Sequence, residues 1–253
     1  MNPFDLTGRL AVVTGAKRGL GFAMAEGLAA AGADIIGVSA SLDPASSQIG
    51  DRVRELGRQF TGYRVDFSRR ADVTAFAQEC ANADRPVDIL VNNAGTIKRA
   101  PAAEHPLDWF DEVLEVDLTS GFVLSQILGR RMLEAGRGRV IFTASMLSFQ
   151  GGINVPGYTA AKSGVAGLVR ALSNEWSSRG VTVNGIAPGY IATDNTQALQ
   201  DDPERSQAIL ERIPAGRWGR PTDLAGAAVF LASDAAAYVT GAILPVDGGW
   251  LGR

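Results

Sequence analysis

The chain has 253 residues, of which 46% are hydrophobic and 20% are charged, and its formal net charge is −3. This composition supports one extensive buried sheet, and about 200 to 250 residues are ordinary for a single α/β domain. The mildly acidic balance argues against nucleic acid and anionic membranes as partners, because both select a basic surface. A single cysteine, Cys80, and a single histidine, His105, which we interpret as a loop residue, exclude an internal disulfide and a histidine-cluster metal site. The N-terminus lacks a signal-peptide pattern, so we expect a cytoplasmic protein without a metal.

A strand, a glycine-rich turn and a helix open the chain. Residues 9–13 are apolar and predict the strand, and an alanine-rich pattern that ends near Ala31 predicts the helix. The turn between them carries Gly15, Gly19 and Gly21. The first glycine permits a tight turn, the second lets the backbone approach a pyrophosphate, and the third allows close helix packing. The spacing is GxxxGxG, and between a strand and a helix it indicates a nucleotide-binding site.

The end of the next strand, residues 34–38, decides which dinucleotide fits. An NAD site usually has an acid there, which bonds both ribose hydroxyls and repels a 2′-phosphate. This chain has an uncharged, hydroxyl-rich turn instead, with two cations in the glycine-rich turn beside it, and such groups favour a phosphate. We therefore predict NADP, with NAD as the alternative if the loop returns Asp43 to the site. The candidates for binding the cofactor here are Lys17, Arg18, Ser39, Ala40 and Ser41.

Helices and strands continue to alternate up to residue 91. Helices are expected near residues 46–58 and 69–82, and strands near residues 61–66 and 87–91. Strands that alternate with helices in this way predict a parallel sheet with right-handed crossovers.

Two of these strands end in polar residues. Asp66 and Phe67 follow the third strand, where an acceptor can bond an adenine amino group; an N-cap for the helix after Ser68 is an equally good interpretation of Asp66. Asn92-Asn93-Ala94-Gly95 follows the fourth strand. Its small, amide-rich turn suits a position under a cofactor, and a structural role in joining strands is just as sensible.

A long helix from about Leu107 to Ala135, which contains Asp117, precedes a strand at residues 139–143. Residues 140–161 then carry no Asp, Glu, Lys, Arg or His, but glycines and a proline interrupt the run, so it is not a membrane span. We interpret it as a pocket wall that excludes water. Ser145 lies in it at the carboxyl end of the strand, where open α/β sheets place their chemistry.

Tyr158 and Lys162 lie one turn apart on the helix after Pro156. A tyrosine in water has a pKa of about 10, and a fixed positive charge a few ångströms away favours the phenolate. The pair therefore predicts a proton-transfer site, with the Ser145 hydroxyl holding the substrate.

The remaining chain completes the alternation. A strand at residues 181–186 ends in Ala187-Pro188-Gly189, a stiff turn that suits contact with a flat ring. Residues 193–213 are polar and helix-prone, and we interpret them as a mobile lid. A helix at residues 221–232 and a strand at residues 242–246 follow.

The predicted fold class is therefore α/β. We expect one Rossmann-fold domain over residues 1–253, with a doubly wound parallel sheet of about seven strands and helices on both faces.

Together these motifs resemble those of the short-chain dehydrogenases/reductases over essentially the full chain. The matching pieces are Thr14-Gly15-xxx-Gly19-x-Gly21, Asn92-Asn93-Ala94-Gly95, Ser145, Tyr158-xxx-Lys162 and Pro188-Gly189. Further segments, at residues 145–153, 187–197, 213–219 and 246–251, look like those of the family's sugar-acid enzymes, which act on gluconate and its 2-deoxy and 2-keto-3-deoxy derivatives.

The resemblance implies roles for individual residues. Tyr158 becomes the acid/base, Ser145 orients the substrate oxygen, and Lys162 supports Tyr158 and binds a ribose. The family's fourth catalytic residue is an asparagine, but this chain has Asp117, whose negative charge could pair with Lys162 and weaken its pull on Tyr158. The cofactor-binding residues implied in addition to those above are Gly15, Gly19, Leu20, Gly21, Asp66, Phe67, Asn93, Ala94, Gly95, Tyr158, Lys162, Pro188, Gly189, Ile191 and Thr193.

We expect reversible hydride transfer between a nicotinamide and a secondary alcohol or ketone of a sugar acid. A carboxylate substrate needs a cation, for which Arg99 and Arg217 are the candidates, and Met146 beside Ser145 would complete the substrate site. The alternatives are a 3-oxoacyl-thioester reductase and a nucleotide-binding regulator that has lost catalysis through Asp117. By analogy with the family, we expect a homotetramer, with the apolar segment 242–250 suited to an interface.

Overall fold

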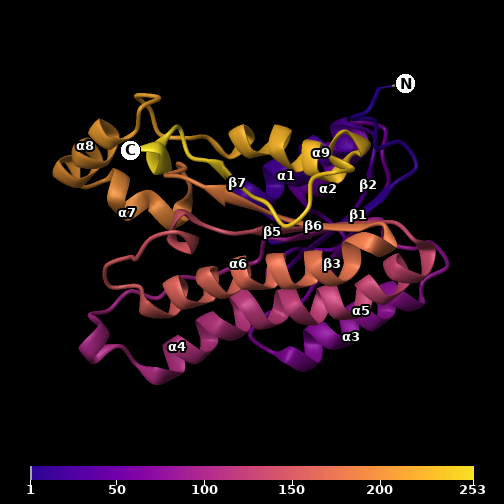
Figure 1. Ribbon diagram of the computed structural model, residues 1–253, viewed down its shortest axis with the longest axis horizontal. Helices are drawn as coiled ribbons and strands as arrows, with labels where there is room; N and C mark the ends of the chain where they lie inside the picture. The colour runs from indigo at the N-terminus through magenta and orange to yellow at the C-terminus, as the bar shows by residue number, and fades with distance from the viewer. Residues whose placement is uncertain (1) are drawn as a thin grey trace.

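A seven-stranded parallel sheet forms the centre of the computed structural model, which describes residues 2–253 (Figure 1). The strands lie in the order β3-β2-β1-β4-β5-β6-β7. The first three strands are added outward from β1 on one side, and β4 to β7 are added on the other side, so the strand order reverses between the neighbouring strands β1 and β4. This confirms the predicted α/β fold class. Such a reversal opens a crevice at the carboxyl ends of the strands, where open α/β sheets bind ligands. The strands are β1 Leu10–Thr14, β2 Asp34–Ser39, β3 Phe60–Arg64, β4 Ile89–Asn92, β5 Gly138–Thr143, β6 Val181–Pro188 and β7 Ile243–Val246.

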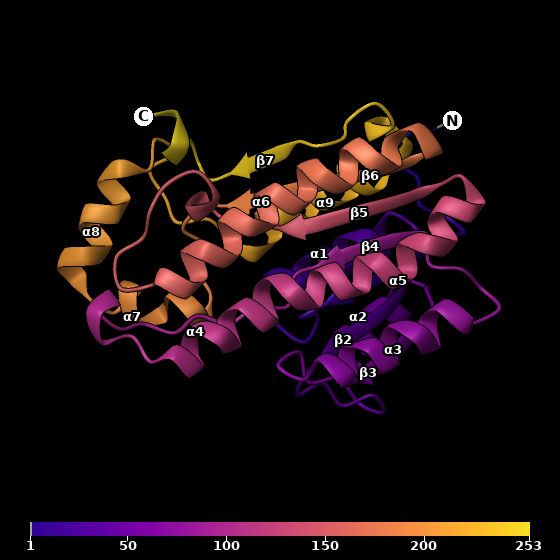
Figure 2. The same ribbon diagram turned by 60° about the horizontal axis from the view of Figure 1, so that its bottom comes forward.

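Helices cover both faces of the sheet (Figures 1 and 2). On one face lie α1 Gly19–Ala30, α2 Gln48–Glu55 and α9 Ala225–Ala232; on the other lie α3 Arg70–Asn82, α4 Leu107–Leu114, α5 Ser120–Ala135 and α6 Pro156–Trp176. Short 3-10 turns occur at Ala102–Glu104, Met146–Ser148, Ser177–Arg179, Asp194–Thr196, Pro221–Leu224, Asp234–Ala236 and Trp250–Gly252. Each helix returns the chain to the amino edge of the sheet, so every strand ends at the same edge.

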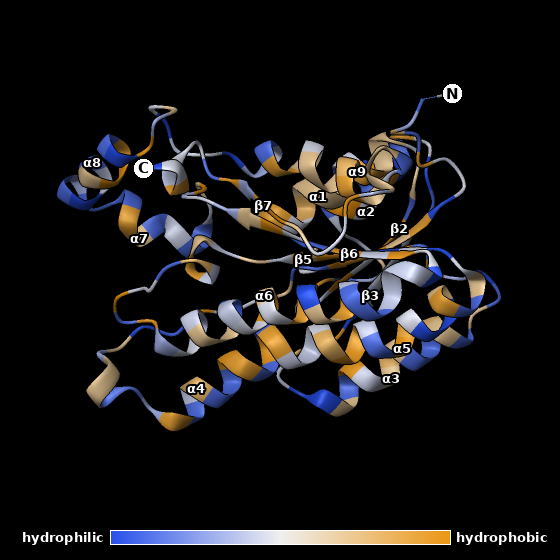
Figure 3. Cartoon of the chain, viewed as in Figure 1, coloured by the Kyte–Doolittle hydropathy of each residue, from blue (hydrophilic) through white to orange (hydrophobic). Residues whose placement is uncertain are grey.

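The central strands are mostly hydrophobic because both of their faces are buried. All residues of β1, β4 and β6 are buried. Orange segments occur along the sheet between the two layers of helices in Figure 3. The edge strand β3 is only partly covered and carries polar residues. Two buried clusters result, one on each face of the sheet, and together they fix the strand ends that carry the candidate site.

The long helix predicted for residues 107–135 is interrupted. A π-helical turn at Glu115–Thr119 separates α4 from α5, and Asp117 lies in it. Such turns widen the helix by one residue and occur often at functional sites. The sequence did not show this break, because no proline or glycine marks it.

Residues 193–213 extend beyond the carboxyl ends of the strands (Figure 1). They contain α7 Gln197–Gln200 and α8 Pro203–Arg212. Ile209 and Ile213 are buried there against Met146 and Trp250, so this segment has a small hydrophobic core that its polar composition conceals. Among residues 2–253, no helix combines the length and hydrophobicity that crossing a bilayer requires.

Candidate active site

Asn93 joins three strands at the carboxyl edge of the sheet. Its side-chain amide donates to the Thr14 carbonyl at 2.9 Å, and the Thr143 hydroxyl donates to its carbonyl oxygen at 3.1 Å. The backbone N–H groups of Asn93 and Ala94 both donate to the Thr14 hydroxyl at 2.8 Å. The strand-joining role expected of this amide-rich turn is therefore present, and the turn holds the ends of β1, β4 and β5 in fixed positions.

The glycine-rich turn between β1 and α1 has the backbone shape that its glycines allow. Gly15 and Gly19 have φ values of +68° and +58°, in the left-handed region that favours glycine. A Cβ atom at Gly21 would collide with the Gly15 carbonyl, so close packing requires a glycine there. Helix α1 begins at Gly19 without a side-chain cap, which leaves its first N–H groups free to bind an anion. Leu20 lies in this first turn.

Lys17 lies against the hydroxyl-rich turn that follows β2. Its ammonium donates to the Ser41 carbonyl at 2.8 Å and to the Ser41 hydroxyl at 3.2 Å, and its backbone N–H donates to the Ser39 hydroxyl at 3.1 Å. Asp43 instead accepts the backbone N–H of Ala45. The fold thus brings together one cation and two hydroxyls where a 2′-phosphate would be placed.

Asp66 and Phe67 differ in whether their side chains are free to contact an adenine. Asp66 Oδ1 accepts the hydroxyl of Ser68 at 2.7 Å and its N–H at 2.9 Å, and these bonds lower the pKa of the Asp66 carboxyl. The N-cap residue of α3 is Arg69, so the alternative interpretation of Asp66 as that cap is wrong. The ring of Phe67 is buried in the core, which leaves its backbone, and not its side chain, for contact with an adenine.

Ser145, Tyr158 and Lys162 come from adjoining elements at this edge. Ser145 follows β5 and is buried, and its Oγ accepts the Leu147 N–H at 3.1 Å, which leaves its own proton to donate. The Lys162 ammonium donates to the Thr143 carbonyl at 3.0 Å and lies 5.3 Å from the centre of the Tyr158 ring. The expected neighbouring positions of the phenol and the ammonium on α6 are present.

Asp117 reaches the same lysine from the π-helical turn. Its Oδ2 lies 3.2 Å from Lys162 Nζ, and its Oδ1 accepts the Thr96 N–H at 2.7 Å. Burial raises the pKa of the Asp117 carboxyl, with the ammonium and the N–H opposing that rise. Burial alone would lower the pKa of Lys162. The Asp117 carboxylate and Tyr158 outweigh this effect, so the pKa of Lys162 is raised and the group remains an ammonium at neutral pH. The ion pair between Asp117 and Lys162, which the sequence analysis considered, is present in the structure.

The two candidate arginines for the substrate have different partners. Arg99 is exposed and donates one N–H to the Asn195 carbonyl at 3.1 Å, across the gap between the β4 loop and the segment after β6. Arg217 forms two hydrogen bonds with the Asp223 carboxylate, at 2.7 and 3.1 Å, beside a cavity of about 150 Å³. Because Asp223 compensates its charge, Arg217 is the weaker candidate.

The remaining predicted residues lie around the start of the 193–213 segment. Pro188 ends β6. Gly189 comes next and lies so close to Asp247 that a Cβ atom at position 189 would not fit. Ile191 pairs with Gly219, and the Thr193 methyl lies 3.8 Å from where a Cβ at Gly19 would be. The segment therefore begins directly beside the glycine-rich turn. Met146 is buried in a cluster with Ile209 of α8, Ile213 and Trp250.

Comparison with known proteins covers the whole chain. The family described as enoyl-(acyl carrier protein) reductase matches residues 15–251. The 2-dehydro-3-deoxy-D-gluconate 5-dehydrogenase of Pseudoalteromonas atlantica is 61% identical, with 100% of both chains aligned. A crystal structure of a candidate 2-deoxy-D-gluconate 3-dehydrogenase from Agrobacterium tumefaciens with bound NADP has a TM-score of 0.93 at 52% identity, with 100% of both chains covered. A candidate NAD(P)-dependent gluconate 5-dehydrogenase from Beutenbergia cavernae, with NADP at low occupancy, has a TM-score of 0.96 at 50% identity and the same coverage.

The chain belongs to the short-chain dehydrogenase/reductase family. This confirms the resemblance found in its motifs, and it makes the protein an oxidoreductase, as expected.

Sequence analysis missed three residues that hold the site of this short-chain dehydrogenase/reductase together. Thr143 contacts Lys162 through a backbone carbonyl, and Thr96 contacts Asp117 through a backbone N–H; any residue can supply these groups, so no sequence signal marks these two contacts. The Ser148 hydroxyl donates to the Lys162 carbonyl at 2.7 Å and ties the loop after β5 to α6. Its signal was available, because Ser145 and Ser148 form a capping box.

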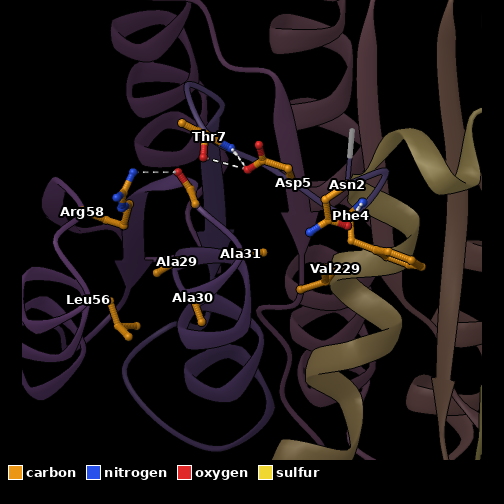
Figure 4. A pocket seen from close by; sticks show the side chains of 11 residues that line it. Asn2, Phe4, Asp5, Thr7, Ala29, Ala30, Ala31, Leu56, Arg58 and Val229 are labelled. Carbon is orange, nitrogen blue, oxygen red and sulfur yellow. Dashed lines mark hydrogen bonds between the residues drawn. The ribbon is translucent and has the colours of Figure 1, made fainter.

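A separate surface cavity of about 370 Å³ lies at the amino ends of the strands (Figure 4). Asp5, which accepts the hydroxyl and N–H of Thr7, lines it together with Arg58, which donates to the Gly32 carbonyl at 3.5 Å. It is at the opposite edge of the sheet from Ser145 and Tyr158, so it is not part of the candidate active site.

Proposed function

We propose that this protein transfers a hydride between NADP(H) and a secondary alcohol or ketone of a sugar acid of the gluconate type. The observation that carries the proposal is the position of Tyr158, with its ammonium neighbour Lys162, at the same sheet edge as Ser145 and the glycine-rich turn. Relatives named for 2-dehydro-3-deoxy-D-gluconate and 2-deoxy-D-gluconate, similar over their full length, support the substrate class.

In this proposal the protein's own groups move and hold the proton. For reduction, Tyr158 gives its phenolic proton to the substrate carbonyl oxygen; for oxidation, it takes the hydroxyl proton. Ser145 donates a hydrogen bond to the same oxygen and holds it in line. Lys162 stabilises the phenolate that forms during reduction. The nicotinamide supplies or accepts the hydride.

The groups at the end of β2 support NADP over NAD. The cluster of Lys17, Ser39 and Ser41 offers donors to a 2′-phosphate, and no acid lies within it. The uncapped start of α1 and the open turn at Gly15 and Gly19 fit a pyrophosphate. Bound NADP in the two solved relatives agrees with this preference.

Arg99 is the proposed partner for the substrate carboxylate. A guanidinium has five N–H donors, and among residues 2–253 only one of those of Arg99 is used, by the Asn195 carbonyl. Its hydrogen bond between the β4 loop and the 193–213 segment supports the proposal of a cation at the entrance to the site. This segment, as the proposed lid, would close over the substrate through its contacts with Met146.

Initial rates test the proposal. Gluconate, 2-deoxygluconate and 2-keto-3-deoxygluconate should react with NADP+ or NADPH at rates well above those with acetoacetyl thioesters. Faster turnover of the thioesters would favour a 3-oxoacyl-thioester reductase, and cofactor binding without turnover of any compound would favour the regulator.

We also propose a homotetramer in the cytoplasm. Leu107, Trp109 and Phe122, on α4 and α5, are exposed hydrophobic side chains that an interface would cover. Light scattering of the purified protein tests the assembly, and a monomer would contradict it. Cell fractionation tests the location.

A further inference from the structure

Tyr158, Lys162 and Asp117 form a buried cluster whose net charge depends on the protonation of Tyr158. The side chains of Lys162 and Asp117 are 4% and 0% exposed, and their charged atoms lie 3.2 Å apart. Water therefore screens neither charge well, and each acts strongly on its neighbours. With Tyr158 protonated, the cluster has a net charge of zero.

Other charges do not alter this sum. Glu112 and Glu115, on the adjoining α4 and π-helical turn, are paired away from the cluster, with Lys98 and Arg70. In the part of the chain that the structure describes, the hydrogen-bond partners of the two charged groups are backbone groups, namely the Thr143 carbonyl for Lys162 and the Thr96 N–H for Asp117. Among residues 2–253, no other charged side chain forms an ion pair with Lys162 or Asp117.

We propose that Asp117 holds Tyr158 in its protonated form by cancelling the positive charge of Lys162. If Tyr158 loses its proton, the neutral cluster becomes a buried group with one net negative charge. With a neutral residue in place of Asp117, the same loss takes the cluster from +1 to 0, which costs less in a poorly solvated site. Asp117 acts through Lys162, and it is a positioning residue that sets when the phenol ionises.

The proposal rests on Tyr158 as the acid/base of the proposed function, and it adds a direction to that function. A tyrosine that keeps its proton can give that proton to a ketone. Compared with a site that has a neutral residue at position 117, reduction would persist to higher pH, and oxidation, which needs the phenolate, would require a higher pH.

The test replaces Asp117 by asparagine, which has the same shape and keeps an oxygen for the Thr96 N–H. Ultraviolet absorbance of the protein without cofactor, with the spectrum of Tyr158→Phe in each background subtracted, follows formation of the Tyr158 phenolate. We expect this transition in Asp117→Asn about one pH unit lower than in the unmodified protein, which is about tenfold more phenolate at a given pH. Glu112→Gln, which removes a carboxylate of α4 that is paired elsewhere, should leave it unchanged.

The pH dependence of activity measures the same shift of the Tyr158 ionisation independently. In Asp117→Asn, the acid limb of kcat/KM for oxidation and the alkaline limb for reduction should both move to lower pH by about one unit. A change in packing alone would lower rates at every pH without moving either limb. The absorbance titration needs no substrate, so it stays decisive even if the sugar-acid assignment fails.

Three outcomes would overturn the proposal. A phenolate transition at higher pH in Asp117→Asn would mean that Asp117 mainly keeps Lys162 charged. An unchanged transition, or an equal shift in Glu112→Gln, would show that Asp117 has no specific effect. If the variant does not fold, carboxyl ¹³C NMR of the unmodified protein decides: an Asp117 carboxyl, assigned through its contact with the Thr96 amide, that is protonated at neutral pH would contradict the required negative charge.

Discussion

Arg18 Nη1 lies 2.9 Å from Asp194 Oδ2, which joins the glycine-rich turn to the first turn of the proposed lid across 176 residues of sequence. Both side chains are largely exposed, so the ion pair contributes little to stability. Its position matters more than its strength, because Arg18 is also a candidate for binding the cofactor, whose phosphates would be a second partner for its guanidinium. The carboxylate and the phosphate would then compete for one guanidinium.

Asp194→Asn should therefore release Arg18 toward the cofactor. We expect the KM for NADPH to fall about two- to threefold, while the free energy of unfolding changes by less than about 1 kcal/mol. Initial rates at varied NADPH, together with urea unfolding, check both parts. A higher KM would mean that Asp194 positions Arg18 for binding and does not compete for it.

Tyr158→Phe removes the proposed proton carrier and keeps the ring. Turnover should fall by at least about a hundredfold, with cofactor affinity and melting temperature nearly unchanged. Tyr238→Phe is the matched control, because that tyrosine is fully exposed and outside the site. Near-normal turnover of Tyr158→Phe would refute the proposed mechanism.

Ser39→Asp places an acid at the end of β2, beside the Lys17 N–H. Repulsion of a 2′-phosphate should lower kcat/KM with NADP+ at least about tenfold and reduce the preference for NADP+ over NAD+. Ser178→Asp adds the same charge at the amino edge of the sheet and should change neither value. An unchanged preference in Ser39→Asp would place the 2′-phosphate elsewhere.

Arg99→Ala removes the proposed carboxylate partner. We expect the KM for a sugar acid to rise about ten- to a hundredfold, with the KM for NADPH unchanged. Arg217→Ala should change stability little, because it breaks an exposed pair with Asp223, and it should leave substrate KM within about threefold. The reverse ranking would show that Arg217 leaves Asp223 when substrate binds.

Gly21→Ala adds a methyl group that would collide with the Gly15 carbonyl. We expect a loss of about 2 kcal/mol or more in unfolding free energy and weaker cofactor binding, because the turn must open to admit it. Gly167→Ala, at a position in α6 with open space around it, should instead stabilise the protein by about 0.5–1 kcal/mol. Chemical denaturation of both variants tests this contrast, and equal effects would contradict the role of Gly21 in packing.

Local patterns predicted much of this fold. The runs predicted at residues 9–13 and 181–186 correspond to β1 Leu10–Thr14 and β6 Val181–Pro188, because strands that are covered on both faces are mostly hydrophobic. The 193–213 segment was harder to interpret. Its two packing residues, Ile209 and Ile213, bury against Met146 and Trp250 from distant parts of the chain, so its own composition suggested a polar surface.

By itself, the sequence determined the α/β class, the glycine-rich turn and the i, i+4 spacing of Tyr158 and Lys162, because strand hydrophobicity, backbone freedom and helical spacing are local properties. Only the tertiary structure decided that Asp117 meets Lys162, that Lys17 meets Ser41 and that Asp223 compensates Arg217. Each of these contacts joins separate elements or turns, and their side chains interact strongly only at the short distances that folding creates.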